Sequence, residues 1–214
     1  MFKQHGSGRT WMAGLLAVIM AGAGCEDDGG GDSFDYGDND RNVCVALGDS
    51  IVEGVEEYSG TPFPALLAQK TGKTVVNLGW GGEHSYQGSA RIGHALALYK
   101  PAHIILLYGA NDLMHGGDVP GIVNELRYMA TTALANRTKP VLCTLPPMTR
   151  HAWNFYDATL VLNAQIRQMA AEEDVPLADL EDIFINRESE LLGDGLHPNA
   201  EGNRLIADLL AREI

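Results

Sequence analysis

A serine, a histidine and an aspartate in this chain stand in short motifs that suit nucleophilic catalysis. Ser50 follows a Gly-Asp pair directly after an apolar run. His197 lies three residues after Asp194 and directly before Pro198. A serine hydroxyl becomes a nucleophile when a histidine takes its proton and a carboxylate fixes the tautomer of that histidine. The three residues therefore predict acyl transfer, with Ser50 as nucleophile, His197 as base and Asp194 as orienting group.

Two further segments supply the hydrogen-bond donors that such a reaction needs. Residues 79–82 read Gly-Trp-Gly-Gly, and residues 109–112 read Gly-Ala-Asn-Asp. A glycine lets a backbone N–H approach a substrate closely, and Asn111 offers an uncharged NH₂ group. Taken singly, each of these segments is also typical of an ordinary turn. Their joint presence favours an oxyanion site built from Asn111 and one of the glycines, Gly81 or Gly82.

The elements that position these motifs are predicted from apolar periodicity. Near-continuous apolar runs, typical of strands buried on both faces, occur at residues 43–47, 74–78, 103–108, 140–145 and 175–178. Helical segments are predicted at residues 62–71, 86–99, 119–137, 159–173 and 200–212. This alternation predicts a three-layer α/β/α sandwich around a parallel sheet. Because loops at the carboxyl ends of parallel strands meet at one edge, we expect the four motifs to converge there.

Length and charge narrow the class of protein. The 214 residues allow one domain with a full-sized core. The formal net charge of −13 argues against a nucleic-acid partner, because such a surface neutralises phosphates with Lys and Arg. Cys44 and Cys143 fall in predicted strands one and four, too far apart for a disulfide, and are expected to be buried thiols. No His or Cys cluster has the spacing of metal ligands, so we expect neither a metal nor another cofactor.

The first 24 residues have the pattern of a secretory signal peptide. A basic start precedes the apolar run 11–20, which is too short for a permanent membrane span, and small residues then lead to Cys25. This ending resembles a bacterial lipoprotein signal, in which Cys25 becomes lipidated. Gly22 departs from that pattern, which prefers an aliphatic residue three positions before the cysteine. The alternative is cleavage at a nearby Ala-x-Ala-like site and secretion. Either way we expect export, and the lipidated form would be anchored in the cell envelope.

The segment after Cys25 is predicted to be a disordered acidic linker. Residues 26–41 contain seven acids, four glycines and little apolar surface. Such a composition cannot offset the entropy lost on ordering. The linker is therefore expected to span residues 25–41, and the catalytic domain residues 42–214.

The four motifs, in this order, resemble those of the SGNH hydrolases, also called GDSL esterases and lipases. The resemblance covers most of residues 43–200, with Ile51 where the family usually has leucine. It implies a compact five-stranded sheet in flavodoxin-like order. It also implies an acyl-enzyme on Ser50 and an oxyanion bound by the Ser50 N–H, the Gly82 N–H and the Asn111 side chain. Gly82 is preferred to Gly81 because the last glycine of that motif is the donor in the family.

Several classes of ester substrate are compatible with these motifs. We expect pocket walls from Trp80, His84, Leu113 and Trp153, and short acyl groups because no bulky lid is evident in the sequence. A carbohydrate deacetylase, a lysophospholipase or a thioesterase would use the same triad. A surface lipoprotein that only binds ligands is the non-enzymatic alternative, but it would need no complete triad.

Overall fold

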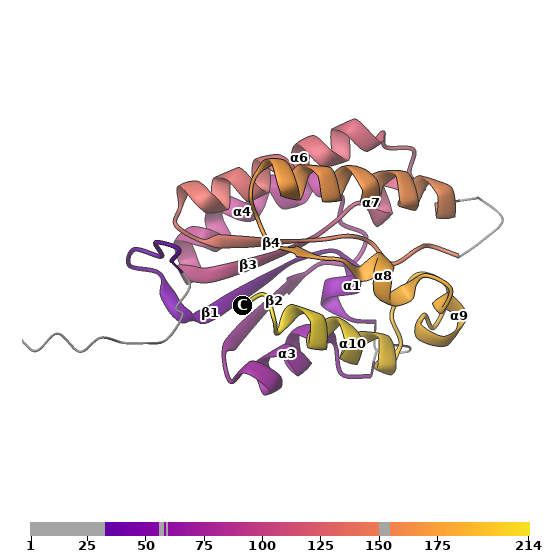
Figure 1. Cartoon of the computed structure of the whole chain (residues 1–214), viewed down its shortest axis with the longest axis horizontal. Coiled ribbons are helices and arrows are strands. Elements are labelled where there is room, and N and C mark those ends of the chain that lie inside the picture. Colours follow the sequence, from indigo (N-terminus) through magenta and orange to yellow (C-terminus); the bar gives the residue numbers. More distant parts are fainter. Residues whose placement is uncertain (1–32, 56–57, 59, 150–154) are drawn as a thin grey trace, which may run out of the picture. The chain divides into compact units, whose positions relative to one another are not determined.

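Five parallel strands form the sheet of the computed structural model, which describes residues 33–55, 58, 60–149 and 155–214. The strand order is β2-β1-β3-β4-β5 (Figure 1). The strands are β1 (Asp40–Gly48), β2 (Thr74–Gly79), β3 (Pro101–Leu107), β4 (Lys139–Cys143) and β5 (Leu177–Ala178). The predicted parallel five-stranded sheet in flavodoxin-like order is confirmed. The predicted signal peptide, Cys25 and Trp153 lie outside the described residues.

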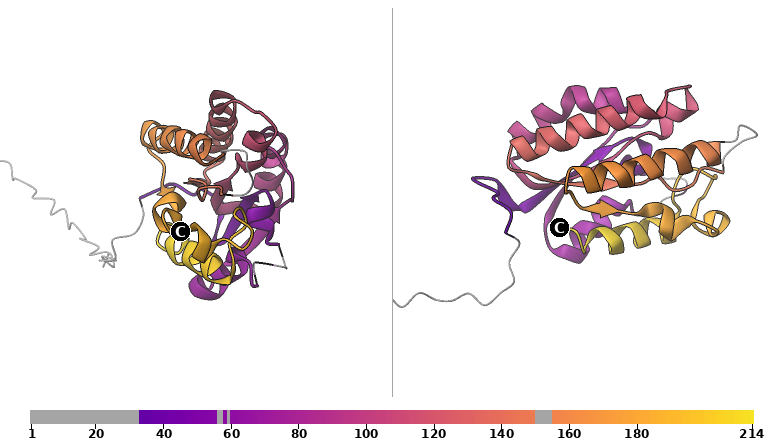
Figure 2. Two further views of the ribbon diagram at one scale, coloured as in Figure 1. Left: turned by 90° about the vertical axis from the view of Figure 1, so that its right-hand side faces the viewer. Right: turned by 45° about the horizontal axis from the view of Figure 1, so that its top comes forward.

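Long helices cover both faces of this sheet and make the outer layers of the predicted sandwich. One layer contains α4 (Ser85–Tyr99), α6 (Val119–Ala135) and α7 (Phe155–Glu172), and the other contains α3 (Phe63–Thr71) and α10 (Ala200–Leu210) (Figures 1 and 2). The amphipathic pattern explains this placement. In α10, for example, Ile206 and Leu210 are one turn apart and both are buried in the core. None of the helices among the described residues is long and apolar enough to cross a membrane.

Four short helices complete the described fold: α1 (Ser50–Glu53), α5 (Ala110–Met114), α8 (Leu180–Phe184) and α9 (Glu188–Leu191). The first two follow β1 and β3 almost directly and carry the motif residues Ser50 and Asn111. The other two fill the connection between β5 and α10, which the sequence analysis left without secondary structure. A helix of four or five residues is held by tertiary packing rather than by its own residues. Its sequence therefore gives only a weak indication that a helix forms.

Strand register brings three of the motifs to one level at the carboxyl edge of the sheet. Gly48 at the end of β1 pairs with Gly79 of β2 on one side and with Leu107 of β3 on the other. The chain leaves the sheet at all three positions and enters the motif loops. Gly79 is required there by close approach, because a Cβ at this position would lie only 2.0 Å from the backbone nitrogen of Glu53 in α1.

The amino-terminal boundary of the domain differs from the one predicted. The compact unit begins at Phe34, and Tyr36 is only 4% exposed. Its hydroxyl lies 3.1 Å from Nε2 of His103 in β3, and the Arg41 guanidinium lies 4.9 Å above its ring. Burial of this aromatic ring offsets the entropy cost of ordering an acidic segment. The predicted disordered linker is therefore wrong for residues 34–41, which belong to the domain.

The two cysteines of the sheet are free thiols, as the sequence predicted. Cys44 in β1 and Cys143 in β4 are both buried, and β3 lies between their strands. Burial raises the pKa of the Cys44 thiol to about 12, although the charge of Lys73 opposes this rise. Cys44 is thus an uncharged core side chain rather than a reactive thiol.

Candidate active site

Ser50, His197 and Asp194 form one continuous chain of polar contacts. Ser50 is the first residue of α1, and its Oγ lies 2.9 Å from Nε2 of His197. The other ring nitrogen of His197, Nδ1, lies 2.9 Å from Oδ2 of Asp194. Asp49 starts α1 by accepting the Ile51 N–H at 2.9 Å, which sets the turn that presents Ser50. The three residues singled out in the sequence are thus brought together with the spacing of a catalytic triad.

The loop between α9 and α10 is closed tightly around Asp194 and His197. Leu192 and Pro198 form an antiparallel bridge at its base. Oδ1 of Asp194 accepts the backbone N–H groups of Leu196 at 3.0 Å and His197 at 2.8 Å. Burial opposes the charge of Asp194, but these hydrogen bonds and the His197 ring outweigh it and hold the pKa of the carboxyl below its ordinary value. The carboxylate is therefore charged wherever His197 acts as a base.

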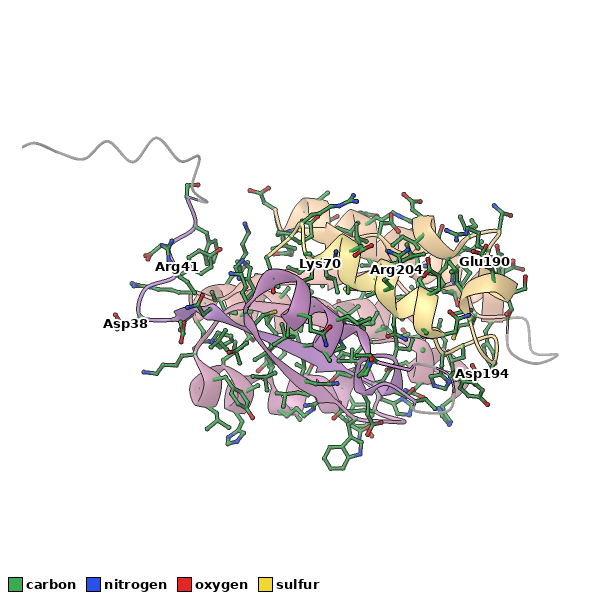
Figure 3. The ribbon with its side chains drawn as sticks, turned by 90° about the horizontal axis from the view of Figure 1, so that it is seen from below. Asp38, Arg41, Lys70, Glu190, Asp194 and Arg204 are labelled. Atoms are coloured by element: carbon green, nitrogen blue, oxygen red, sulfur yellow. The ribbon has the colours of Figure 1, made fainter. Side chains whose placement is uncertain are left out.

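The triad lies at the carboxyl edge of the sheet. Figure 3 shows Asp194 at the end of the domain opposite Asp38 and Arg41, which flank the start of β1. This is the edge at which ligands bind in open parallel α/β sheets. Loops that are distant along the chain therefore meet at this edge, as predicted from the sequence.

Tyr58 is a neighbour of the triad that sequence analysis missed. Its ring is stacked on the His197 imidazole, with 6.3 Å between ring centroids and 6° between ring planes. Gly193 leaves space for it, because a Cβ at that position would lie 2.6 Å from Cβ of Tyr58. The segment around Tyr58 has no apolar periodicity and no motif, so no local signal pointed to this contact.

Two backbone N–H groups beside Ser50 are available to an oxyanion. Neither the Ser50 N–H nor the Gly82 N–H donates to another residue in the part of the chain that the structure describes. The Gly81 N–H, by contrast, donates to Oε2 of Glu53 at 2.8 Å. A Cβ on Gly81 would lie 3.9 Å from Cβ of Ser50, so this loop borders the nucleophile. Gly82, with a φ of +78°, is therefore the better donor of the two glycines.

The Asn111 side chain is buried in the same site, in the first turn of α5. Its Nδ2 donates to the carbonyl oxygen of Glu83 at 3.0 Å and to Oδ2 of Asp49 at 3.3 Å. The second bond is longer than a typical N–H···O bond, so that hydrogen is weakly held. The amide is thus fixed in orientation, and its weakly held N–H can be shared with a stronger acceptor, such as an oxyanion.

Asp49 is a buried carboxyl between the nucleophile and the Asn111 amide. Burial raises its pKa, the Ile51 N–H lowers it, and the nearby charges of Asp112 and Glu83 raise it, giving a pKa of about 7. A protonated Asp49 is therefore a substantial species near neutral pH. In the sequence, Asp49 is distinguished only as part of the Gly-Asp-Ser motif.

Asp112 and His84 hold the start of α4 rather than the substrate. The Asp112 carboxylate accepts the backbone N–H of Ser85 at 3.0 Å and its hydroxyl at 2.7 Å. The His84 N–H donates to Oε1 of Gln87 at 3.0 Å, which caps the helix, and its ring nitrogen Nδ1 lies 3.8 Å from Asp112. His84 was predicted to line the pocket, and the contacts of its N–H and its ring are with residues at the start of α4.

Leu113 and Trp80, which were also predicted to line the pocket, differ in their exposure. Leu113 is 7% exposed and packs in the hydrophobic core, so only a small part of its side chain is open to a pocket. It points inward because α5 begins immediately after β3 and packs against α7. Trp80 is 69% exposed and lines a cleft together with Gly81 and Gly82.

Within the described ranges, no three His, Cys, Asp or Glu side chains gather as metal ligands.

The chain is similar in sequence to a known thioesterase and a known arylesterase. The chain is 28% identical to the thioesterase 1/protease 1/lysophospholipase L1 of Escherichia coli K12 over 177 residues, which covers 81% of this chain and 83% of that protein. It is 27% identical to an arylesterase of Vibrio mimicus over 181 residues, covering 79% of this chain and 86% of the relative.

A solved structure shares the fold. The crystal structure of the acetyl xylan esterase AlAXEase has a TM-score of 0.70 and 20% identity, and the match covers 80% of this chain and 99% of that chain. The model of the GDSL-like lipase/acylhydrolase family matches residues 46–205, a range that contains all four motifs. This protein therefore belongs to the GDSL-like lipase/acylhydrolase family.

Proposed function

We propose that this protein is a serine esterase that hydrolyses short-acyl carboxylic esters through an acyl-enzyme on Ser50. The observation that carries the proposal is the unbroken line of contacts from Ser50 Oγ through the His197 ring to the Asp194 carboxylate, at 2.9 Å in each step. Membership of an acylhydrolase family supports the same reaction class.

In the first half-reaction, Ser50 Oγ attacks the ester carbonyl carbon while Nε2 of His197 takes the hydroxyl proton. The carbonyl oxygen becomes an oxyanion that accepts hydrogen bonds from the N–H groups of Ser50 and Gly82 and from Nδ2 of Asn111. When the tetrahedral intermediate collapses, the C–O bond to the alcohol breaks. His197 returns its proton to the leaving oxygen, and Ser50 keeps the acyl group.

In the second half-reaction, water attacks the acyl-enzyme and His197 again removes a proton. The carboxylic acid leaves, and the proton on His197 returns to Ser50. Asp194 keeps the Nδ1 proton directed at its own carboxylate in both halves, so Nε2 stays available as the base. The low pKa of Asp194 supports this role, because the carboxylate stabilises the imidazolium without taking its proton.

Hydrolysis of p-nitrophenyl esters tests the proposal. We expect the wild type to hydrolyse p-nitrophenyl acetate and the Ser50→Ala variant to lose that turnover while keeping its thermal transition. The kcat/KM of the wild type should fall from the acetate to the octanoate ester. A Ser50→Ala variant as active as the wild type on every ester would refute the proposal that the protein is a serine esterase. A preference for octanoate would refute only the short-acyl part.

We also propose that the mature protein is exported and anchored through a lipid on Cys25. Support comes from the signal-like pattern of residues 1–24 and from the small residues directly before Cys25. In a bacterial host, we expect the wild type in the membrane fraction and the Cys25→Ala variant outside it. A wild-type protein found wholly in the soluble fraction would refute lipidation and leave the esterase proposal untouched.

A further inference from the structure

A cleft of about 240 Å³ lies beside the oxyanion donors and is not used by the triad chemistry. It is lined by Trp80, Gly81, Gly82, Glu83, Gln87 and Arg91. Gly81 and Gly82 line this cleft, and a Cβ on Gly81 would lie 3.9 Å from Cβ of Ser50, so the cleft begins next to the nucleophile. A substrate whose ester carbonyl sits on Ser50 can therefore extend another part of itself into the cleft.

The charges that line the cleft cancel each other. Glu83 is 6% exposed, and its Oε1 accepts from Nε of Arg91 at 2.8 Å, while Nη2 of Arg91 also contacts the same carboxylate. The Tyr108 hydroxyl donates to Glu83 at 2.6 Å. The Glu53 carboxylate lies close by, on the Gly81 N–H. The cleft therefore presents no uncompensated positive charge to a phosphate or carboxylate ligand.

Two donor groups in the cleft are nevertheless open. Oε1 of Gln87 accepts the His84 N–H, which directs the other half of the amide, Nε2, away from the helix cap. Neither Nε2 of Gln87 nor Nη1 of Arg91 donates to any residue in the described ranges. The indole of Trp80, 69% exposed, adds a broad apolar face next to them. Donors beside an aromatic face suit a ligand with oxygen acceptors on its edge and C–H groups on its face.

We propose that this cleft binds a sugar ring of an uncharged O-acylated carbohydrate, with the ring stacked on Trp80 and its oxygens accepting from Gln87 and Arg91. The inference rests on the proposed esterase function and names its substrate class. A long acyl chain fits the cleft poorly, because the open donors of Gln87 and Arg91 would lose hydration without gaining a hydrogen bond.

A selectivity ratio tests this assignment. We define it as kcat/KM for an O-acetylated xylo-oligosaccharide divided by kcat/KM for p-nitrophenyl acetate, which carries no sugar. Trp80→Ala should lower this ratio about tenfold, the change that 1.4 kcal/mol of lost binding produces, mainly through the KM for the sugar ester. The matched control is Tyr86→Ala, which removes another exposed aromatic ring that does not line the cleft. It should leave the ratio unchanged.

Gln87→Glu gives a second test with little risk to folding. A glutamate keeps the oxygen that accepts the His84 N–H and replaces the open NH₂ donor by an acceptor. Its negative charge lies in the first turn of α4, where a helix tolerates it well. We expect the selectivity ratio to fall in this variant too. A ratio that stays at the wild-type value in both Trp80→Ala and Gln87→Glu would overturn the proposal.

A binding experiment on an inactive variant separates the sugar-binding proposal from the esterase function on which it rests. By calorimetry, an unacetylated xylo-oligosaccharide should bind the Ser50→Ala variant, and binding should weaken about tenfold when Trp80→Ala is added. No binding would overturn the sugar assignment. So would a Trp80→Ala loss that grows with the acyl length of p-nitrophenyl esters, because it would reveal an acyl subsite. Absence of Ser50-dependent hydrolysis of any ester would instead refute the underlying esterase function.

Discussion

The Asp194 carboxylate holds His197 at two points, its backbone and its ring. Oδ1 accepts the His197 N–H at 2.8 Å, and Oδ2 lies 2.9 Å from Nδ1 of the same residue. One side chain therefore closes the loop and also fixes the tautomer of the base. Three residues of spacing are enough for both contacts, because the loop turns back on itself between Leu192 and Pro198.

This double contact predicts different outcomes for two substitutions of Asp194. Asp194→Asn keeps an oxygen for the backbone N–H groups but turns an NH₂ group toward Nδ1, which forces the proton onto Nε2. We expect kcat to fall by about 10³- to 10⁴-fold with little change in the melting temperature. Asp194→Ala should lose activity and also melt at a lower temperature. Equal melting temperatures for the two variants would contradict a role of Asp194 in closing the loop.

The Asn111 amide predicts a loss confined to the transition state. Asn111→Ala removes one oxyanion donor, so kcat on p-nitrophenyl acetate should fall by about 10²- to 10³-fold while KM changes little. The surface asparagine Asn124 offers a matched control, and Asn124→Ala should behave as the wild type. A large rise in KM with an unchanged kcat would show instead that Asn111 binds the ground state.

The raised pKa of Asp49 predicts a pH-dependent contribution to stability. The folded protein releases this proton at a pH of about 7, whereas the unfolded chain releases it at about 3.9. Between these values the folded state holds a proton that the unfolded state lacks, so this contribution to stability falls as the pH rises, by on the order of a few kcal/mol. In urea unfolding, Asp49→Ala should therefore cost more stability at pH 5 than at pH 8.

The comparison of Asp49→Ala with the wild type at two pH values cancels the other titrating groups to first order. A cost that is the same at both pH values would show that Asp49 has an ordinary pKa in the folded protein. A larger cost at pH 8 would show that its ionised form is the stabilised one.

The ring of Tyr58 predicts a modest effect on the base. The parallel stack on His197 restricts the imidazole, and aromatic contacts of this kind contribute about 0.5–1.5 kcal/mol. Tyr58→Ala should therefore lower kcat/KM on p-nitrophenyl acetate by about 2- to 10-fold. Tyr58→Phe keeps the ring and should recover most of this loss. If Tyr58→Phe were as impaired as Tyr58→Ala, the hydroxyl rather than the stack would be responsible.

The features predicted correctly from the sequence are those with a strong local signal. β3 is a buried run that is apolar except for His103, and this run located the strand without any tertiary information. The contact of Asp194 with His197 was also predictable, because two residues three positions apart in a loop can meet without help from the rest of the fold. Convergence of Ser50 with that loop followed from the rule for parallel sheets.

The features that were missed depend on contacts between distant segments. Tyr36 lies in an acidic, glycine-containing stretch, yet it is buried by His103, 67 residues later. The stack of Tyr58 on His197 and the bond between Asn111 and Asp49 join loops that no local pattern relates. The burial of Leu113 was also not predicted: it lies two residues after Asn111 in the motif segment, but its side chain packs in the core.

Ser50 Oγ is the atom that carries the acyl group in the proposed mechanism, and every other role in the site depends on it. The direct test is mass spectrometry of the protein quenched with acid during steady-state hydrolysis of p-nitrophenyl acetate. We predict one acetyl group, located on the peptide that contains Ser50 and absent from the Ser50→Ala variant. Active enzyme with no acetyl group, or with the acetyl group on another side chain, would contradict the account.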